Sequence, residues 1–107
     1  MEKVIRDGKV AVLYSPGYGA GWYTWNNDNY KQLIFQPTLV KMVEEGKQEE
    51  ITEELCQNLL GLSDGDYVCD LGVSDLEIKW VKEGTPFYIC ENDGHEYIIT
   101  VDDCLVA

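Results

Sequence analysis

Residues 4–14 read VIRDGKVAVLY, a pattern that predicts a β-hairpin at the start of the chain. Asp7-Gly8 is a pair that type I′ turns prefer, because both central residues of such a turn need a positive φ angle. The run after the turn, Lys9–Tyr14, is almost entirely apolar. We therefore expect its strand to cross the core and to end at Ser15-Pro16, where proline removes a backbone donor.

Residues 15–26 read SPGYGAGWYTWN and bring three glycines and four aromatic residues together. Glycine lets a backbone take positive φ or approach another group closely, and large rings beside it suit the grip of a flat ligand. In this interpretation the glycines supply backbone donors, the rings stack on a base, and a nearby cation neutralises phosphate. The expected ligand-binding residues are Arg6, Gly17, Tyr18, Gly19, Gly21, Trp22 and Trp25. Lys9 is the second candidate for the cation. The alternative is that Trp22 and Trp25 anchor the loop in the core.

The middle of the chain carries the signals of short helices. Asn26, Asn27 and Asp28 are possible N-caps for a helix that runs to about Ile34. A second helix is expected from Pro37 to Gly46, and a third from Thr52 to Gly61, since proline suits a first turn and glycine a C-terminal cap.

Strand patterns return after residue 66. We expect a short strand at 67–71, a half-buried strand at 76–80, and two further runs at 87–91 and 96–101 separated by turns, which together form a meander. The fold class that follows is α+β, a single domain over residues 1–107. It has an antiparallel sheet made of the N-terminal hairpin and the C-terminal meander, with two or three short helices packed on it.

The charge of the chain is unevenly distributed. The net charge is −12. Residues 1–40 carry four basic and three acidic side chains, a net charge of +1, and the remainder carries −13. Direct binding to nucleic acid is disfavoured, because phosphate affinity comes from clustered Lys and Arg. The acidic residues form a solvated face or imitate a phosphate backbone toward a basic partner. They are Glu44, Glu45, Glu49, Glu50, Glu53, Glu54, Asp64, Asp66 and Asp70.

No residue pattern indicates catalysis or a cofactor. The four cysteines at 56, 69, 90 and 104 form no C-x-x-C pair, and His95 is the single histidine, so we expect free thiols and no metal site. The glycine loop matches neither the dinucleotide fingerprint nor the phosphate loop, which need other residues where Trp22-Tyr23-Thr24 stand. We therefore expect a protein that is not an enzyme. With no signal peptide and no membrane-spanning run in the sequence, a cytoplasmic protein is expected.

Two stretches carry a resemblance: VIRDGKVAVLYSPGYGAGWYTWN at residues 4–26 and DLEIKWVKEGTPFYICENDGHEYI at residues 75–98. Together they resemble a group of small uncharacterised proteins encoded by phages and related bacterial elements. The residues of its recognisable motifs are Arg6, Gly17, Gly19, Gly21, Trp22, Trp25, Trp80 and Gly94. The group supplies no catalytic residue to transfer.

The resemblance implies a role against host defence, in the host cytoplasm. The first hypothesis is a homo-oligomeric binding protein that sequesters a small nucleotide-derived immune signal through the glycine and aromatic loop. The alternative is an acidic protein-protein inhibitor, like an anti-CRISPR protein or a nucleic-acid mimic, that blocks a basic host defence effector.

Overall fold

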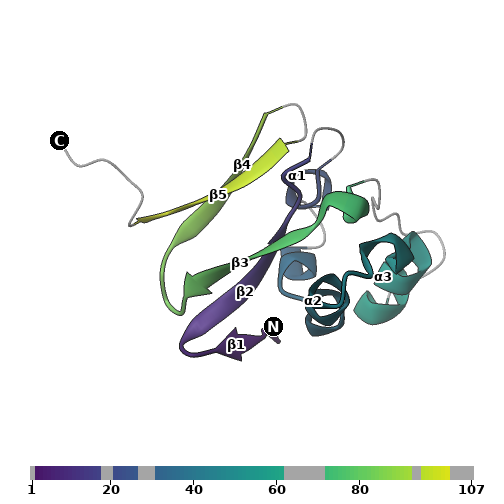
Figure 1. Ribbon diagram of the computed structural model, residues 1–107, viewed down its shortest axis with the longest axis horizontal. Helices are drawn as coiled ribbons and strands as arrows, with labels where there is room; N and C mark the ends of the chain where they lie inside the picture. The colour runs from purple at the N-terminus through teal and green to yellow at the C-terminus, as the bar shows by residue number, and fades with distance from the viewer. Residues whose placement is uncertain (1, 18–20, 27–30, 62–71, 93–94, 102–107) are drawn as a thin grey trace.

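The structure is a computed structural model that describes residues 2–17, 21–26, 31–61, 72–92 and 95–101. Its strands form a three-stranded sheet in the order β1-β2-β3 and a separate two-stranded ribbon, β4-β5, and every pairing is antiparallel. This confirms the α+β class, with helices from the middle of the chain (Figure 1). The elements are β1 (Ile5–Arg6), β2 (Lys9–Tyr14), α1 (Tyr23–Asn26), η1 (Lys31–Ile34), α2 (Pro37–Glu44), η2 (Gln48–Glu50), α3 (Glu53–Leu60), η3 (Val73–Asp75), β3 (Glu77–Lys82), β4 (Phe87–Asn92) and β5 (His95–Thr100), where η denotes a 3₁₀ helix.

The N-terminal hairpin is confirmed. Asp7 has φ 52° and Gly8 has φ 74°, the two positive angles of a type I′ turn. Arg6 and Lys9 face each other across the turn, and Ile5 faces Val10.

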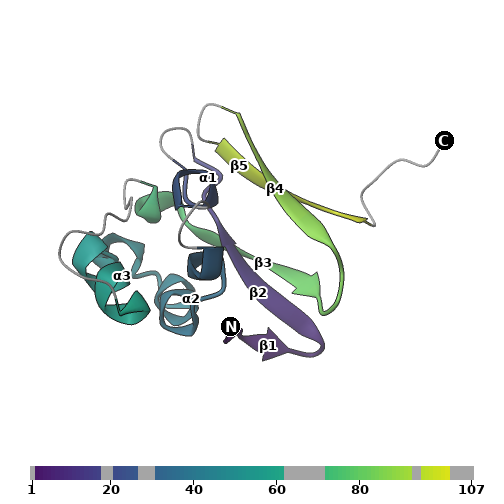
Figure 2. The ribbon, with the colours of Figure 1, turned by 180° about the vertical axis from the view of Figure 1, so that it is seen from behind.

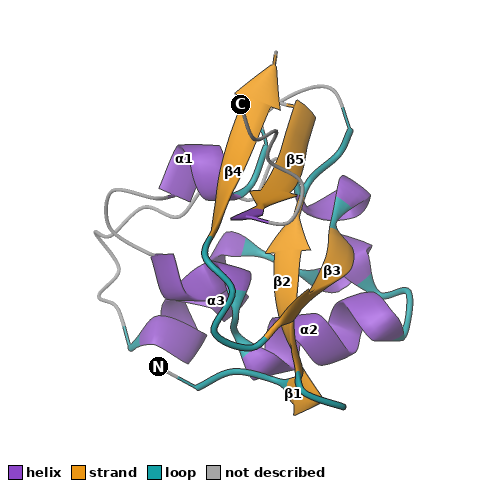
Figure 3. Cartoon of the chain, turned by 90° about the vertical axis from the view of Figure 1, so that its left-hand side faces the viewer, coloured by secondary structure: helices purple, strands orange, loops and turns teal. Residues whose placement is uncertain are grey.

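Strand β2 is the centre of the molecule, because it is buried on both faces. Ala11, Val12 and Leu13 are fully buried although consecutive strand residues point to opposite sides. Helix α2 contacts β2 and β3, while β5 contacts β2. Figures 1 and 2 show the three-stranded sheet between the helices and the β4-β5 ribbon, and Figure 3 shows the ribbon extending beyond the end of β2.

The pairing of the C-terminal strands differs from a single meander. Strand β3 pairs with β2 along six residue positions, from Lys9 opposite Lys82 to Tyr14 opposite Glu77. Strand β1 pairs with only two residues of β2, so β3 supplies most of the backbone pairing of this buried strand. After β3 the chain leaves this sheet, and β4 pairs with β5 alone. The strand expected at 67–71 lies outside the described residues.

Two of the three expected helices form as predicted. Pro37 occupies the first turn of α2, and Gly46 follows this helix with φ 73°. In α3, the Thr52 side chain accepts a hydrogen bond from Leu55 N at 3.1 Å, and Gly61 ends the helix in the left-handed conformation. The helix expected at 26–34 differs, since α1 ends at Asn26 and a 3₁₀ helix covers Lys31–Ile34.

The ribbon is joined to the sheet by a buried carboxylate. Glu96 is fully buried, and its Oε1 accepts a hydrogen bond from Ser15 N at 2.9 Å. The backbone N–H of Glu96 donates to Ser15 O at 2.8 Å. Ser15 Oγ in turn donates to Gly72 O at 3.1 Å. These bonds connect the end of β2, the start of β5 and the segment that leads into β3.

Replacing Glu96 tests this joint. Glu96→Ala should lower the free energy of unfolding by about 2 to 3 kcal/mol, because it leaves the buried Ser15 N–H without an acceptor. Glu96→Gln keeps an acceptor oxygen and should lose less. Urea denaturation measures both, with Glu83→Ala in the exposed turn after β3 as the control, which should stay within about 0.5 kcal/mol of wild type. Equal losses for the alanine and glutamine variants would contradict the assignment.

Candidate functional site

The described part of the glycine and aromatic loop turns inward. Trp22 is 0% exposed and belongs to the hydrophobic core. Asn26 Nδ2 donates to Trp22 O at 3.0 Å and fixes the backbone there. The expectation that the Trp22 ring stacks on a ligand is therefore corrected: burying a large apolar ring stabilises the fold, and no face is left for a guest. Among the described buried side chains, Trp22 Nε1 is the polar atom without a hydrogen-bond partner.

The loop glycines serve close packing. A Cβ added at Gly17 would lie 2.2 Å from Asp75 Oδ2, and one added at Gly72 would lie 2.1 Å from Gly21 O. Gly17 and Gly21 thus pack directly against the segment that precedes β3. The Asp75 carboxylate beside Gly17 also opposes an anion, which disfavours the expected phosphate contact there. Tyr18, Gly19 and the side chain of Trp25 lie outside the described residues, and their part in ligand binding stays a prediction.

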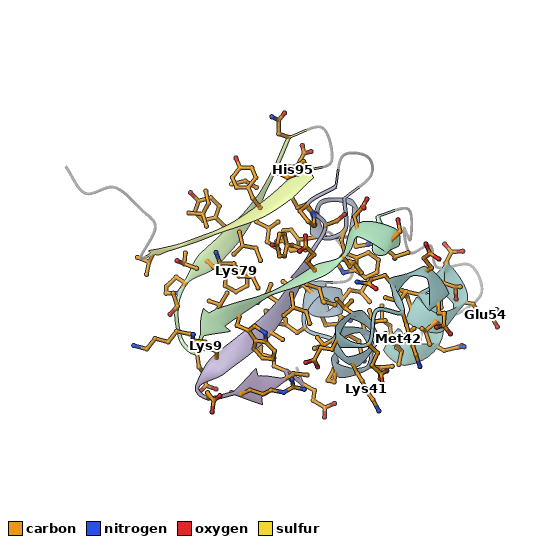
Figure 4. The ribbon with its side chains drawn as sticks, in the orientation of Figure 1. Lys9, Lys41, Met42, Glu54, Lys79 and His95 are labelled. Atoms are coloured by element: carbon orange, nitrogen blue, oxygen red, sulfur yellow. The ribbon has the colours of Figure 1, made fainter. Side chains whose placement is uncertain are left out.

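His95 also has a structural contact in this region. Its Nδ1 lies against the carbonyl oxygen of Pro16, which fits a donated hydrogen bond, and its ring is tilted toward that of Tyr97 with the centroids 6.3 Å apart. Figure 4 shows His95 at the end of the ribbon next to the loop. The residue therefore ties β5 to the segment that follows β2.

Arg6 does not join the loop. It lies at the opposite end of β2, and six strand residues at about 3.4 Å each separate the two ends by about 20 Å. Its guanidinium Nη2 donates to Glu44 Oε1 at 2.9 Å, and Nη1 pairs with Glu44 Oε2. The hydrogen bond and charge of Glu44 raise the pKa of Arg6, so the side chain stays cationic. The predicted pairing of Arg6 with Trp22 in one site is therefore wrong.

The ring that Arg6 does contact is Trp80. The guanidinium carbon lies 5.4 Å from the centre of the Trp80 ring, within the range of a cation–π interaction. Together with Asp7 and Lys9, these two residues line a surface hollow of about 290 Å³. Sequence reasoning placed Trp80 in a half-buried strand and missed this cluster. The strand period indicated which residues share a face with Trp80, but only the register of β3 on β2 brings Trp80 near Arg6 and Lys9.

A second hollow lies at the other end of β3, among acidic residues. Gln48 Nε2 donates to Leu76 O at 3.1 Å and holds η2 against η3. The hollow there has a volume of about 460 Å³ and is lined by Pro16, Gly17, Gln48, Ser74, Asp75, Leu76 and Glu77.

Two acidic residues, Asp75 and Glu77, line this hollow. Together with the acidic residues of 45–54 we name them the acidic surface: Glu45, Glu49, Glu50, Glu53, Glu54, Asp75 and Glu77. All are exposed except Glu53, which is half-buried. Lys47 Nζ lies 3.9 Å from Glu45 Oε1. Glu49, Glu50 and Glu54 form no ion pair with any described residue.

Two further features are absent from the described residues. Within the described ranges, no three side chains of His, Cys, Asp or Glu come together in a way that could hold a metal ion. In the same part of the chain, no helix has the length and apolar character needed to cross a membrane.

The chain was compared with protein-family models, curated proteins and solved structures. None matched. The assignment of function therefore depends on the two hollows and the charges around them.

The inward position of Trp22 predicts the effect of its removal. Trp22→Ala should lower the free energy of unfolding by about 3 to 5 kcal/mol, because it deletes a ring from the core. Tyr88→Ala is the matched control, since Tyr88 is 55% exposed, and should cost much less. Urea denaturation followed by circular dichroism measures both. Wild-type stability in Trp22→Ala would show that the ring is outside the core.

The close packing of the loop predicts a difference between two glycines. Gly72→Ala should destabilise by about 1 to 3 kcal/mol, because its Cβ meets rigid backbone at Gly21. Gly17→Ala should cost less, since its two closest contacts are the carboxyl atoms of the exposed Asp75 side chain, which can rotate away, and only Asp75 Cβ at 2.8 Å requires a small backbone shift. Thermal unfolding of the two variants gives the comparison, and the reverse order would refute the packing described above.

Proposed function

We propose that this protein is a non-enzymatic inhibitor that places its acidic surface against a basic groove of another protein. The observation that carries the proposal is the convergence of η2 and η3. The Gln48–Leu76 hydrogen bond holds η2, which contains Glu49 and Glu50, against η3. Asp75 and Glu77 line a hollow of about 460 Å³ there. A hollow with a carboxylate rim suits the cationic side chain of a partner.

The core anchors this surface. Ile51, between Glu50 and Glu53, is 2% exposed, and Cys56, two residues after Glu54, is 0% exposed. Val43 is buried near the end of α2. The anchors hold the backbone and leave the carboxylates in solvent. Glu53 and Glu54 also lie in the first turn of α3, where negative charge favours the helix. That local benefit does not extend to Glu49, Glu50, Asp75 or Glu77, which lie outside α3.

The resemblance to phage-encoded proteins supports a setting for this activity. In the host cytoplasm, basic grooves that bind nucleic acid are common targets for a protein that carries closely spaced carboxylates, because such carboxylates reproduce the charge of a phosphate backbone. The proposed target is accordingly a basic effector of host defence.

Sequestration of a nucleotide-derived signal by the glycine and aromatic loop stays a prediction. Its described members contribute a buried ring at Trp22 and a glycine packed beside Asp75. Assembly of a homo-oligomer also stays a prediction. The proposal above rests on neither.

Charge reversal tests the inhibitor. Glu49→Lys together with Glu50→Lys should weaken binding to the partner by about 10- to 100-fold, because each reversal replaces attraction by repulsion. The partner is captured from host cells with the wild-type protein, purified, and titrated by calorimetry. Wild-type affinity should fall steeply between about 50 mM and about 300 mM salt, as expected for exposed charges. Wild-type protein should also inhibit the activity of the captured partner.

The matched control is Glu2→Lys with Glu83→Lys, which changes the net charge equally at residues outside the acidic surface. It should retain most of the affinity. Equal loss in both double variants would mean that net charge alone drives binding, and undiminished binding by the first variant would place the contact elsewhere. Either result would overturn the proposal.

A further inference from the structure

Three cations stand in one row across the main sheet, at the end far from the loop. Arg6 in β1 lies directly opposite Lys9 in β2, and Lys9 lies directly opposite Lys82 in β3. Residues directly opposite each other share a face of the sheet, so the three side chains project on the same side. This happens in a chain of net charge −12 that has only eight basic residues.

The row works against the stability of the fold. Like charges directly opposite on neighbouring strands are destabilising. Glu44 pairs with Arg6, while neither Lys9 nor Lys82 forms an ion pair with another described residue. Lysine on an edge strand protects against unwanted strand pairing, which explains Lys82 on β3. It does not explain Lys9, which is on the central strand and already has a partner on each side.

The surroundings of the row form a site. Trp80 lies directly opposite Ala11, and this pair is two residues further along the strands than the Lys9–Lys82 pair. The Trp80 side chain is therefore on the same face of the sheet as the three cations. Arg6 is held in place by two hydrogen bonds to Glu44 and by the Trp80 ring. A guanidinium has five N–H donors, so the remaining N–H groups of Arg6 can donate to a ligand. The hollow of about 290 Å³ lies between Arg6, Asp7, Lys9 and Trp80. Figure 4 shows Lys9 well apart from Glu54, and the hollow shares no residue with the acidic surface.

The spacing of the row selects the ligand. Neighbouring strands are about 4.8 Å apart, so three strands spread the cations over about 10 Å. That span exceeds what one phosphate group can contact and suits a chain of two or three phosphates. We propose that Arg6, Lys9 and Lys82, beside Trp80, bind a linear di- or triphosphate, either as inorganic polyphosphate or as part of a nucleotide.

Asp7 gives the site an internal control. Asp7 lines the hollow, and its negative charge opposes an anion. Its position in the turn has a φ of 52°, which few residue types adopt readily. Asparagine suits the same turn position and removes the charge. Asp7→Asn should therefore preserve the hairpin and tighten anion binding by about three- to tenfold, a gain that a general loss of structure would not produce.

Calorimetric titration of the full chain tests the proposal, with tripolyphosphate, ATP and AMP as separate probes. Tripolyphosphate and ATP should bind with Kd below about 1 mM and AMP much more weakly. Lys9→Gln and Lys82→Gln should each weaken triphosphate binding by about tenfold, as expected for loss of a charge-assisted hydrogen bond. Tighter binding of ATP than of tripolyphosphate would place the base against Trp80, and equal binding would assign the site to the phosphate chain alone.

The matched control is Lys47→Gln, which removes the same charge near the acidic surface and should leave binding unchanged. The Tm of Lys9→Gln and Lys82→Gln should stay level or rise, because a like-charge pair is removed. Absence of binding by both triphosphates, equal weakening by Lys47→Gln, or a fall in Tm with unchanged affinity would each overturn the proposal. Since the hollow and the acidic surface share no residue, these outcomes leave the proposed inhibitor untouched.

Discussion

The hydrogen bonds between Ser15 and Glu96 join the two sheets of this protein, and the rest of the arrangement depends on them. They hold the β4-β5 ribbon over the face of β2 that the helices leave open. With both faces covered, β2 contributes Ala11, Val12 and Leu13 to the core as fully buried residues. A buried carboxylate is costly unless its oxygens are hydrogen-bonded, and here one oxygen satisfies a backbone donor at the point where β2 ends.

Local signals in the sequence were sufficient for the hairpin, α2 and α3. Asp7-Gly8, Pro37 and Thr52 each act within a few residues of themselves, so their effects can be inferred without a partner. The pairing of β3 with β2 could not be inferred in this way. It joins segments about 70 residues apart, and the strand period of residues 76–80 is equally compatible with pairing to the neighbouring run at 87–91.

The candidate sites depend even more on contacts between distant segments, which local sequence signals do not reveal. Glycines followed by tryptophans suggest a ligand loop, but identical residue types serve when a backbone must approach another closely, as Gly21 does at Gly72. Arg6 was predicted to bind phosphate from its chemistry, while its position beside Trp80 and Lys82 became visible only through the register. Of the acidic residues predicted as a surface, Glu49, Glu50 and Glu54 are exposed, while Asp64, Asp66 and Asp70 lie outside the described residues. The approach of η2 to η3, which carries Asp75, involves a side-chain hydrogen bond from Gln48 that the sequence did not reveal.

The Ser15–Glu96 joint also determines when the molecule can be completed during synthesis. Its two residues are 81 positions apart, so β2 emerges from the ribosome long before the strand that covers its second face. Until residue 96 is made, the helices can cover only one side of β2, and an apolar strand face stays open to solvent or to chaperones. A topology with contacts this distant folds slowly compared with a helical protein of equal length. The interval in which the nascent chain is most exposed to aggregation is therefore built into the order of its strands.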